Sequence, residues 1–157
     1  MERSLIITIL VLVLCACGPG PDQVSVDTPE RPVGSDAFLG TRIRYDGYYM
    51  AGNKGVFYLV RFFPQGNAVL INGMGDAVGD LPLKLVRDAQ PDPLVGHYNV
   101  PVQVVKDSLF FTTTPRRGEI DYSGRCVHPD TLRLYRHSHI TGRKEILDYV
   151  FQADGSQ

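Results

Sequence analysis

Two histidines separated by one residue, His137 and His139, have the spacing in this sequence that best suits metal chemistry. On a strand, residues two apart project from the same face about 7 Å from each other, so two imidazoles there could share a metal ion. Zinc needs a third protein ligand at about 2 Å, and the nearest sources are His128 and Asp130 in the preceding turn. The sequence has no second spaced pair of ligands. We therefore interpret the histidines as surface residues beside a turn and predict no metal and no cofactor.

Residue types used in nucleophilic and acid-base catalysis are present without the spacing that catalysis needs. No serine lies in a G-x-S-x-G elbow, in which a strained turn exposes the hydroxyl group. Glu119 and Asp121 alternate with Ile120 and Tyr122, as expected on a half-exposed strand. We interpret Cys126 as a small residue packed in a strand. A reactive thiol needs a cationic neighbour that lowers its pKa, and the sequence places Arg125 and His128 nearby without showing where their side chains point. The sequence therefore predicts a protein that is not an enzyme.

Aromatic side chains are the most prominent binding groups in the sequence, with eight tyrosines, seven phenylalanines and no tryptophan. A barrel of about eight strands is wide enough either to be filled by side chains or to hold one small ligand. Arg61 lies among apolar residues. It either points inward, where it needs a partner and would orient a ligand, or lies outside with its stem over aromatic rings. The ligand-binding residues that we predict are Arg61, Tyr45, Tyr49, Phe57 and Tyr58.

Short strands are the elements that would position these residues. Hydrophobic residues recur with a period of two, and the turn "PQGN" at 64–67 joins two such runs as a hairpin. Close, regular spacing of short strands favours an antiparallel sandwich or barrel. The predicted strands are 42–50, 56–63, 68–73, 96–100, 108–114, 118–126, 131–139 and 144–152.

One segment, 79–90, interrupts the series of strands. Its leucines have mixed spacing, Asp80 is placed as an N-cap, and Pro82 is tolerable in a first turn. The prolines of "PDP" at 91–93 would end a helix, because proline has no N–H to donate. We predict a short helix here that closes one mouth of the barrel.

The N-terminus contains an apolar run, "LIITILVLVLCA" at 5–16, in which Thr8 is the one polar residue. It is too short to span a bilayer, which takes about 20 residues, and it suits the apolar region of a secretory signal. The alternative, a helix buried in a core, would join this run directly to a flexible tract. The sequence "LCAC" at 14–17 resembles the lipobox of bacterial lipoprotein precursors. That resemblance implies a signal peptide over 1–16 and acyl chains on Cys17.

The following residues, 17–35, predict a disordered tether, because 18–35 contain four prolines, three glycines and no aromatic residue. Gly18 in place of an aspartate implies, by the same resemblance, an outer-membrane lipoprotein facing the periplasm. Residues 36–157 have the size of one domain. The formal net charge is −1, with acidic and basic residues interleaved, so we expect no nucleic-acid partner.

Three motifs resemble a known domain. "VRFFPQG" at 60–66 is similar to a strand and turn of the lipocalin-like β domain that occurs in small bacterial proteins and after the F-box of F-box only proteins. "GEIDYSG" at 118–124 and "SHITG" at 138–142 resemble later strands of the bacterial versions. The resemblance implies an all-β, antiparallel lipocalin-like barrel of about eight strands with one short helix. It implies no chemistry, because a fold does not determine a function.

Together these features predict a non-enzymatic lipoprotein of the bacterial cell envelope, anchored to the membrane through Cys17. Its barrel would bind a small apolar or amphipathic ligand. The alternative is a module with a filled core and no ligand, which displays a face to another envelope protein.

Overall fold

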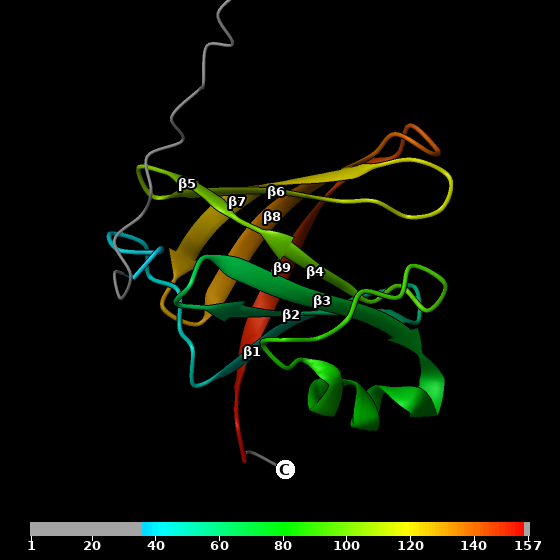
Figure 1. The fold of residues 1–157 in the computed structure, drawn as a ribbon, viewed down its shortest axis with the longest axis horizontal. Helices are drawn as coiled ribbons and strands as arrows, with labels where there is room; N and C mark the ends of the chain where they lie inside the picture. Colours follow the sequence, from blue (N-terminus) through cyan, green and yellow to red (C-terminus); the bar gives the residue numbers. More distant parts are fainter. Residues whose placement is uncertain (1–35, 156–157) are drawn as a thin grey trace, which may run out of the picture. The chain divides into compact units, whose positions relative to one another are not determined.

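The computed structural model describes residues 36–155, which form one antiparallel sheet of nine strands, curled into a nearly closed barrel, and one short helix (Figure 1). The predicted signal peptide 1–16, Cys17 and the tether 17–35 lie outside the described residues. The sheet order is β4-β3-β2-β1-β9-β8-β7-β6-β5, which confirms the predicted all-β antiparallel barrel. The elements are β1 Gly47–Asn53, β2 Val56–Phe63, β3 Asn67–Met74, the 3₁₀ helix η1 Gly75–Lys84, β4 Tyr98–Pro101, β5 Gln103–Val105, β6 Ser108–Thr113, β7 Ile120–His128, β8 Thr131–Ser138 and β9 Lys144–Ala153.

The predicted strands correspond to every strand except β5, which has three residues and is too short to show a period of two. The first strand begins at Gly47 and not at residue 42. The reason is local, because the backbone N–H of Arg44 donates to the hydroxyl of Tyr49 (3.0 Å) and not to a neighbouring strand.

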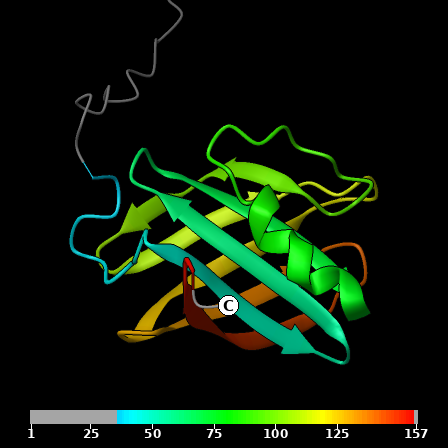
Figure 2. The same ribbon diagram turned by 90° about the horizontal axis from the view of Figure 1, so that it is seen from below.

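The barrel closes because the two edge strands of the sheet are neighbours in sequence. β4 ends at Pro101 and β5 begins at Gln103, so Val102 alone separates them. Val102 is buried, and its N–H donates to the carbonyl oxygen of Gly66 (2.8 Å). On the opposite side, β1 pairs with both β2 and β9 and so joins the first strand to the last. The sheet therefore has an inner and an outer face (Figure 2).

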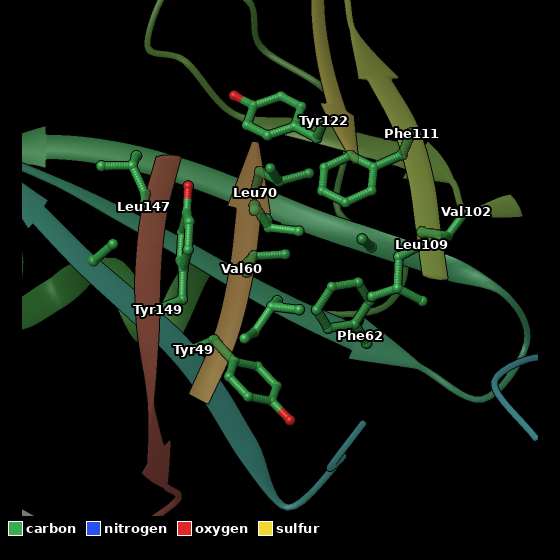
Figure 3. Packing of buried hydrophobic residues seen from close by; sticks show 14 of the residues in the cluster. Tyr49, Val60, Phe62, Leu70, Val102, Leu109, Phe111, Tyr122, Leu147 and Tyr149 are labelled. Atoms are coloured by element: carbon green, nitrogen blue, oxygen red, sulfur yellow. The ribbon is translucent and has the colours of Figure 1, made fainter. Parts of the chain in front are cut away.

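Alternate residues of the strands fill the inside of the barrel (Figure 3). Tyr49 meets Phe62 and Phe151 edge to face, with ring centroids 6.0 and 5.1 Å apart, a favourable geometry for aromatic rings. Cys126 is a free cysteine, so the described domain depends on hydrophobic burial and hydrogen bonds. Interior residues with almost no exposed surface include Tyr49, Val60, Phe62, Leu109, Leu132, Leu134 and Tyr149.

The helix η1 lies on the outer face of the barrel, so its predicted position at a mouth was wrong. Leu81 of the helix and Leu85 just after it pack against Leu59, Val69 and Ile71 on the outward side of β2 and β3. The helix also ends before the predicted boundary at residue 90. Among residues 36–155, no helix has both the length and the apolar character needed to cross a membrane.

Gly124 on β7 is a site of close approach between strands. A methyl group added there would collide with the carbonyl oxygen of Arg133 on β8. We therefore expect Gly124→Ala to lower the free energy of unfolding by about 1–3 kcal/mol, the usual range for overpacking, in urea unfolding experiments. Gly52→Ala is the control, since its new methyl would meet only the ring of Phe57 at 3.4 Å. Equal stability of the two variants would contradict this packing.

The buried hydroxyl of Tyr149 should make the free energy of unfolding depend on pH in the alkaline range. Burial raises the pKa of its hydroxyl well above the ordinary value of about 10. The folded state then keeps a proton that the unfolded state loses, so the contribution is complete below pH 10 and is lost as pH rises further. In guanidinium titrations at about pH 8 to 11, Tyr149→Phe should show a shallower fall in stability, by up to about 1.4 kcal/mol per pH unit. Parallel curves for the variant and the wild type would contradict the assignment.

Candidate functional site

A pocket with a volume of about 810 Å³ opens at one end of the barrel. We call it the mouth pocket. Its rim is formed by the loop 93–96 and the turn 140–143. Its walls carry aromatic and polar groups from β2, β4, β7 and β8, and Asn72 of β3 also lines it. These wall residues are Tyr58, Tyr98, Ile120, Tyr122, Arg136 and Ser138.

The barrel is filled at one end and open at the other. On β8, Leu132 and Leu134 belong to the core, and Arg136, two residues further on, lines the mouth pocket. At the opposite end, Phe38 from the segment before β1 packs against Phe62, with ring centroids 5.4 Å apart. The apolar interior is therefore plugged at that end and becomes polar toward the mouth.

Arg136 is held in the wall by a largely buried ion pair. Its Nη1 lies 3.0 Å from Oε1 of Glu145 on β9, and the two side chains are 13% and 10% exposed. The other carboxylate oxygen, Oε2, accepts from Asn53 Nδ2 (3.0 Å) and lies 2.7 Å from Arg143 Nη2. We call these four residues the ion cluster. Two guanidinium groups share one carboxylate, so the cluster keeps one net positive charge at the mouth pocket.

Tyrosines surround the guanidinium group of Arg136. Its Nε lies 3.4 Å from the hydroxyl of Tyr122, and its Cζ lies 5.6 Å from the centre of the Tyr58 ring, within cation–π range. Tyr122 stacks on Phe111 with ring centroids 4.8 Å apart (Figure 3). Burial raises the pKa of Tyr122 and of Tyr98, so both hydroxyls stay neutral and can donate hydrogen bonds.

The five predicted ligand-binding residues do not converge on one cavity. Tyr58 lines the mouth pocket. Tyr49 is buried in the core, and Tyr45 hydrogen-bonds to Asp36. Phe57 packs on the outer face against the residues under η1.

Arg61 adopts the outward of its two predicted orientations. It pairs with Asp154, its guanidinium lies 5.9 Å from the centre of the Phe63 ring, and it borders a groove beside η1. The outer face of β2 is apolar there because the helix covers it. Because both faces of β2 are apolar near Arg61, the sequence alone does not show which way its side chain points.

Arg136, Tyr98 and Tyr122 line the mouth pocket but are not among the predicted site residues. A signal for Arg136 was present in "TLRLYRHS", since Arg136 shares its parity with Leu132 and Leu134. An arginine on the apolar face of a strand points into the barrel and needs a partner there. Arg136 points into the mouth pocket, and its partner is Glu145.

Cys126 has the environment of a packed thiol. It is half-buried beside the core, and burial raises its pKa. A thiol whose pKa is raised is a poor nucleophile at neutral pH.

Comparison with protein-family models, with curated proteins and with solved structures gives no match for this chain.

Two arginines of β8 allow a matched test of the ion cluster. Arg136 faces Glu145 inside the barrel, and Arg133 faces Asp148 outside it, in the same register between β8 and β9. We expect Arg136→Leu to lower the free energy of unfolding by about 3 kcal/mol, because it leaves a buried carboxylate short of a partner. Arg133→Leu should cost less than about 1 kcal/mol. Chemical unfolding measures both, and equal losses would contradict the burial of the inner pair.

Proposed function

We propose that this chain is a non-enzymatic, lipid-anchored protein of the bacterial cell envelope, facing the periplasm from the outer membrane, and that its mouth pocket binds a small amphipathic ligand with an anionic head. The lipobox-like residues 14–17 and the short apolar run before them support the anchor. The observation that carries the binding proposal is the positive ion cluster in the wall of an aromatic pocket.

The size and lining of the mouth pocket suit a small ligand. Pockets for small molecules have volumes of about 300–1,000 Å³, mostly apolar walls and a few convergent polar groups. Here tyrosine rings and Ile120 supply the apolar surface, and Asn72, Arg136, Ser138, Thr141 and Arg143 make the rest of the lining polar, which suits an amphipathic ligand. Because the core below the mouth is filled, we place the ligand at the mouth and not along the barrel axis.

The charge of the ion cluster favours an acidic head group. Arginine binds carboxylate and phosphate oxygens through parallel N–H donors, and these charge-assisted hydrogen bonds are the strong ones. Within residues 36–155, Arg136 donates to Glu145 through Nη1 and lies near Tyr122 through Nε. Its Nη2 is the group that we assign to the ligand. Arg143, half exposed at the rim, adds a second cation.

The second candidate function is a protein-interaction module. Leu94 and Val95 in the rim loop are 71% and 54% exposed, as expected where an apolar side chain meets a partner. A module of this kind would use the rim and leave the mouth pocket without a small ligand.

Binding of two molecules with the same tail tests the ligand proposal. We expect laurate to bind the purified full chain in calorimetric titrations, and dodecanol, which lacks the carboxylate, to bind at least about tenfold more weakly, or about 1.4 kcal/mol. Arg143→Gln, an exposed change at the rim, should weaken laurate binding, and Arg133→Gln on the outer face should not. Equal affinities for laurate and dodecanol, or no binding at all, would exclude the anionic-head proposal and favour the interaction module.

The two N-terminal cysteines allow a controlled test of the anchor. In the native bacterial host, the wild-type protein and Cys15→Ser should partition into detergent and begin at an acylated Cys17, as judged by mass spectrometry. Cys17→Ser should lose the acyl mass, because no other residue fits the modified position of the lipobox. Detergent partition and acylation of Cys17→Ser at the wild-type level would overturn the anchor.

A further inference from the structure

Three metal-ligating side chains gather on the outer face of the barrel, on the opposite side of the sheet from the ion cluster. They are Asp121 on β7, His137 on β8 and His139 just after β8. One ligand atom from each, a ring nitrogen or a carboxylate oxygen, lies within 4.8 Å of the others. The two imidazole rings have centroids 4.3 Å apart.

The pairing of β7 with β8 creates this cluster. Asp121 and His137 are direct partners in the register of the two strands. The backbone N–H of His139 donates to the carbonyl oxygen of Glu119 (3.0 Å), which keeps His139 beside β7 after β8 has ended. Residues two apart share a face, so both histidines project on the side of Asp121.

A neighbouring side chain already orients the carboxylate. Thr112, opposite Asp121 on β6, donates from Oγ1 to Asp121 Oδ1 (2.7 Å). The other oxygen, Oδ2, lies 2.6 Å from His139 Nε2. The hydrogen bonds from His139 and Thr112 lower the pKa of Asp121, so the carboxylate is charged at neutral pH. Outer partners that fix a ligand in this way are typical of metal sites.

We propose that Asp121, His137 and His139 bind one divalent transition-metal ion, and the donor set of two imidazoles and one carboxylate points to Zn²⁺. Zinc sites with three protein ligands leave the fourth position to water. Tetrahedral ligands at about 2.0–2.1 Å from zinc lie about 3.3 Å from one another. The ion would therefore replace the Asp121–His139 hydrogen bond and draw in His137, which lies on the outer face and is partly exposed.

Charged neighbours set the expected affinity. Lys144 on β9 is the register partner of His137, and its ammonium group disfavours a second cation nearby. Glu119 is exposed, its carbonyl oxygen accepts from the backbone N–H of His139, and its negative charge acts in the opposite direction. We therefore expect micromolar binding and not the nanomolar binding of a closed structural site.

The third ligand differs from the two that the sequence suggested. Asp130 is engaged elsewhere, since its Oδ1 lies 2.7 Å from Arg44 Nη1. His128 is at the far end of β7 from Asp121. Asp121 is 16 residues before His137 in sequence and becomes its neighbour only through the register of β7 and β8.

Calorimetric titration with Zn²⁺ alone tests the site. The sample is the full chain with Cys15→Ser and Cys17→Ser, purified in detergent, so that the N-terminal thiols do not bind the ion. We expect one equivalent to bind with micromolar Kd. Asp121→Asn, His137→Gln and His139→Gln should each weaken binding at least tenfold, and His128→Gln, an exposed histidine outside the cluster, should leave it unchanged.

A spectroscopic measurement distinguishes coordination of the ion by these side chains from nonspecific binding to the protein. Co²⁺ in the same sample should give visible d–d absorption bands, which Zn²⁺ abolishes and which His137→Gln lacks. No binding, or equal binding by the three ligand variants and His128→Gln, would overturn the proposal. Because these residues face outward, laurate binding at the mouth should be the same in all four variants, so the two proposals fail independently.

Discussion

Closure of the sheet is the constraint on which the mouth pocket and the separation of an inner from an outer face depend. The pairing of β1 with β9 and the continuity of β4, Val102 and β5 convert a flat sheet into a wall with an inside and an outside. Once the wall exists, alternation along each strand decides the environment of every side chain. On β8, Arg136 then faces the mouth and His137, the next residue, faces solvent. One strand therefore contributes to two sites with different chemistry.

The ion cluster places charged side chains in the wall of a small barrel whose interior is mainly apolar. A buried charge is costly unless it is paired and fully hydrogen-bonded. Glu145 meets this requirement with three partners, Arg136, Arg143 and Asn53. Apolar residues of similar size could fill the same space without that requirement, as they do lower in the barrel, where Leu134 and Leu147 pair between the same two strands. The presence of charged residues at the mouth therefore favours a pocket that binds a ligand over a barrel end that is filled by side chains.

The sequence predicted the barrel well and its sites poorly, for physical reasons. Most of the longer strands show a period of two, whereas β5 has three residues and shows none. Arg61 was ambiguous because η1 makes the outer face of β2 as apolar as the inner one. Arg136 was readable from its parity with Leu134. The partnership of Asp121 with His137 was not, because strand register is a tertiary property that a single sequence does not reveal.

Locating a bound ligand is the most direct test of the mouth pocket as a binding site. Nuclear Overhauser effects between the methylene protons of laurate and the aromatic protons of the full chain identify the contacting side chains. We expect contacts with the rings of Tyr58, Tyr98 and Tyr122 in the mouth pocket. Contacts confined to Leu83 and Val86, beside Arg61 in the groove under η1, would contradict it.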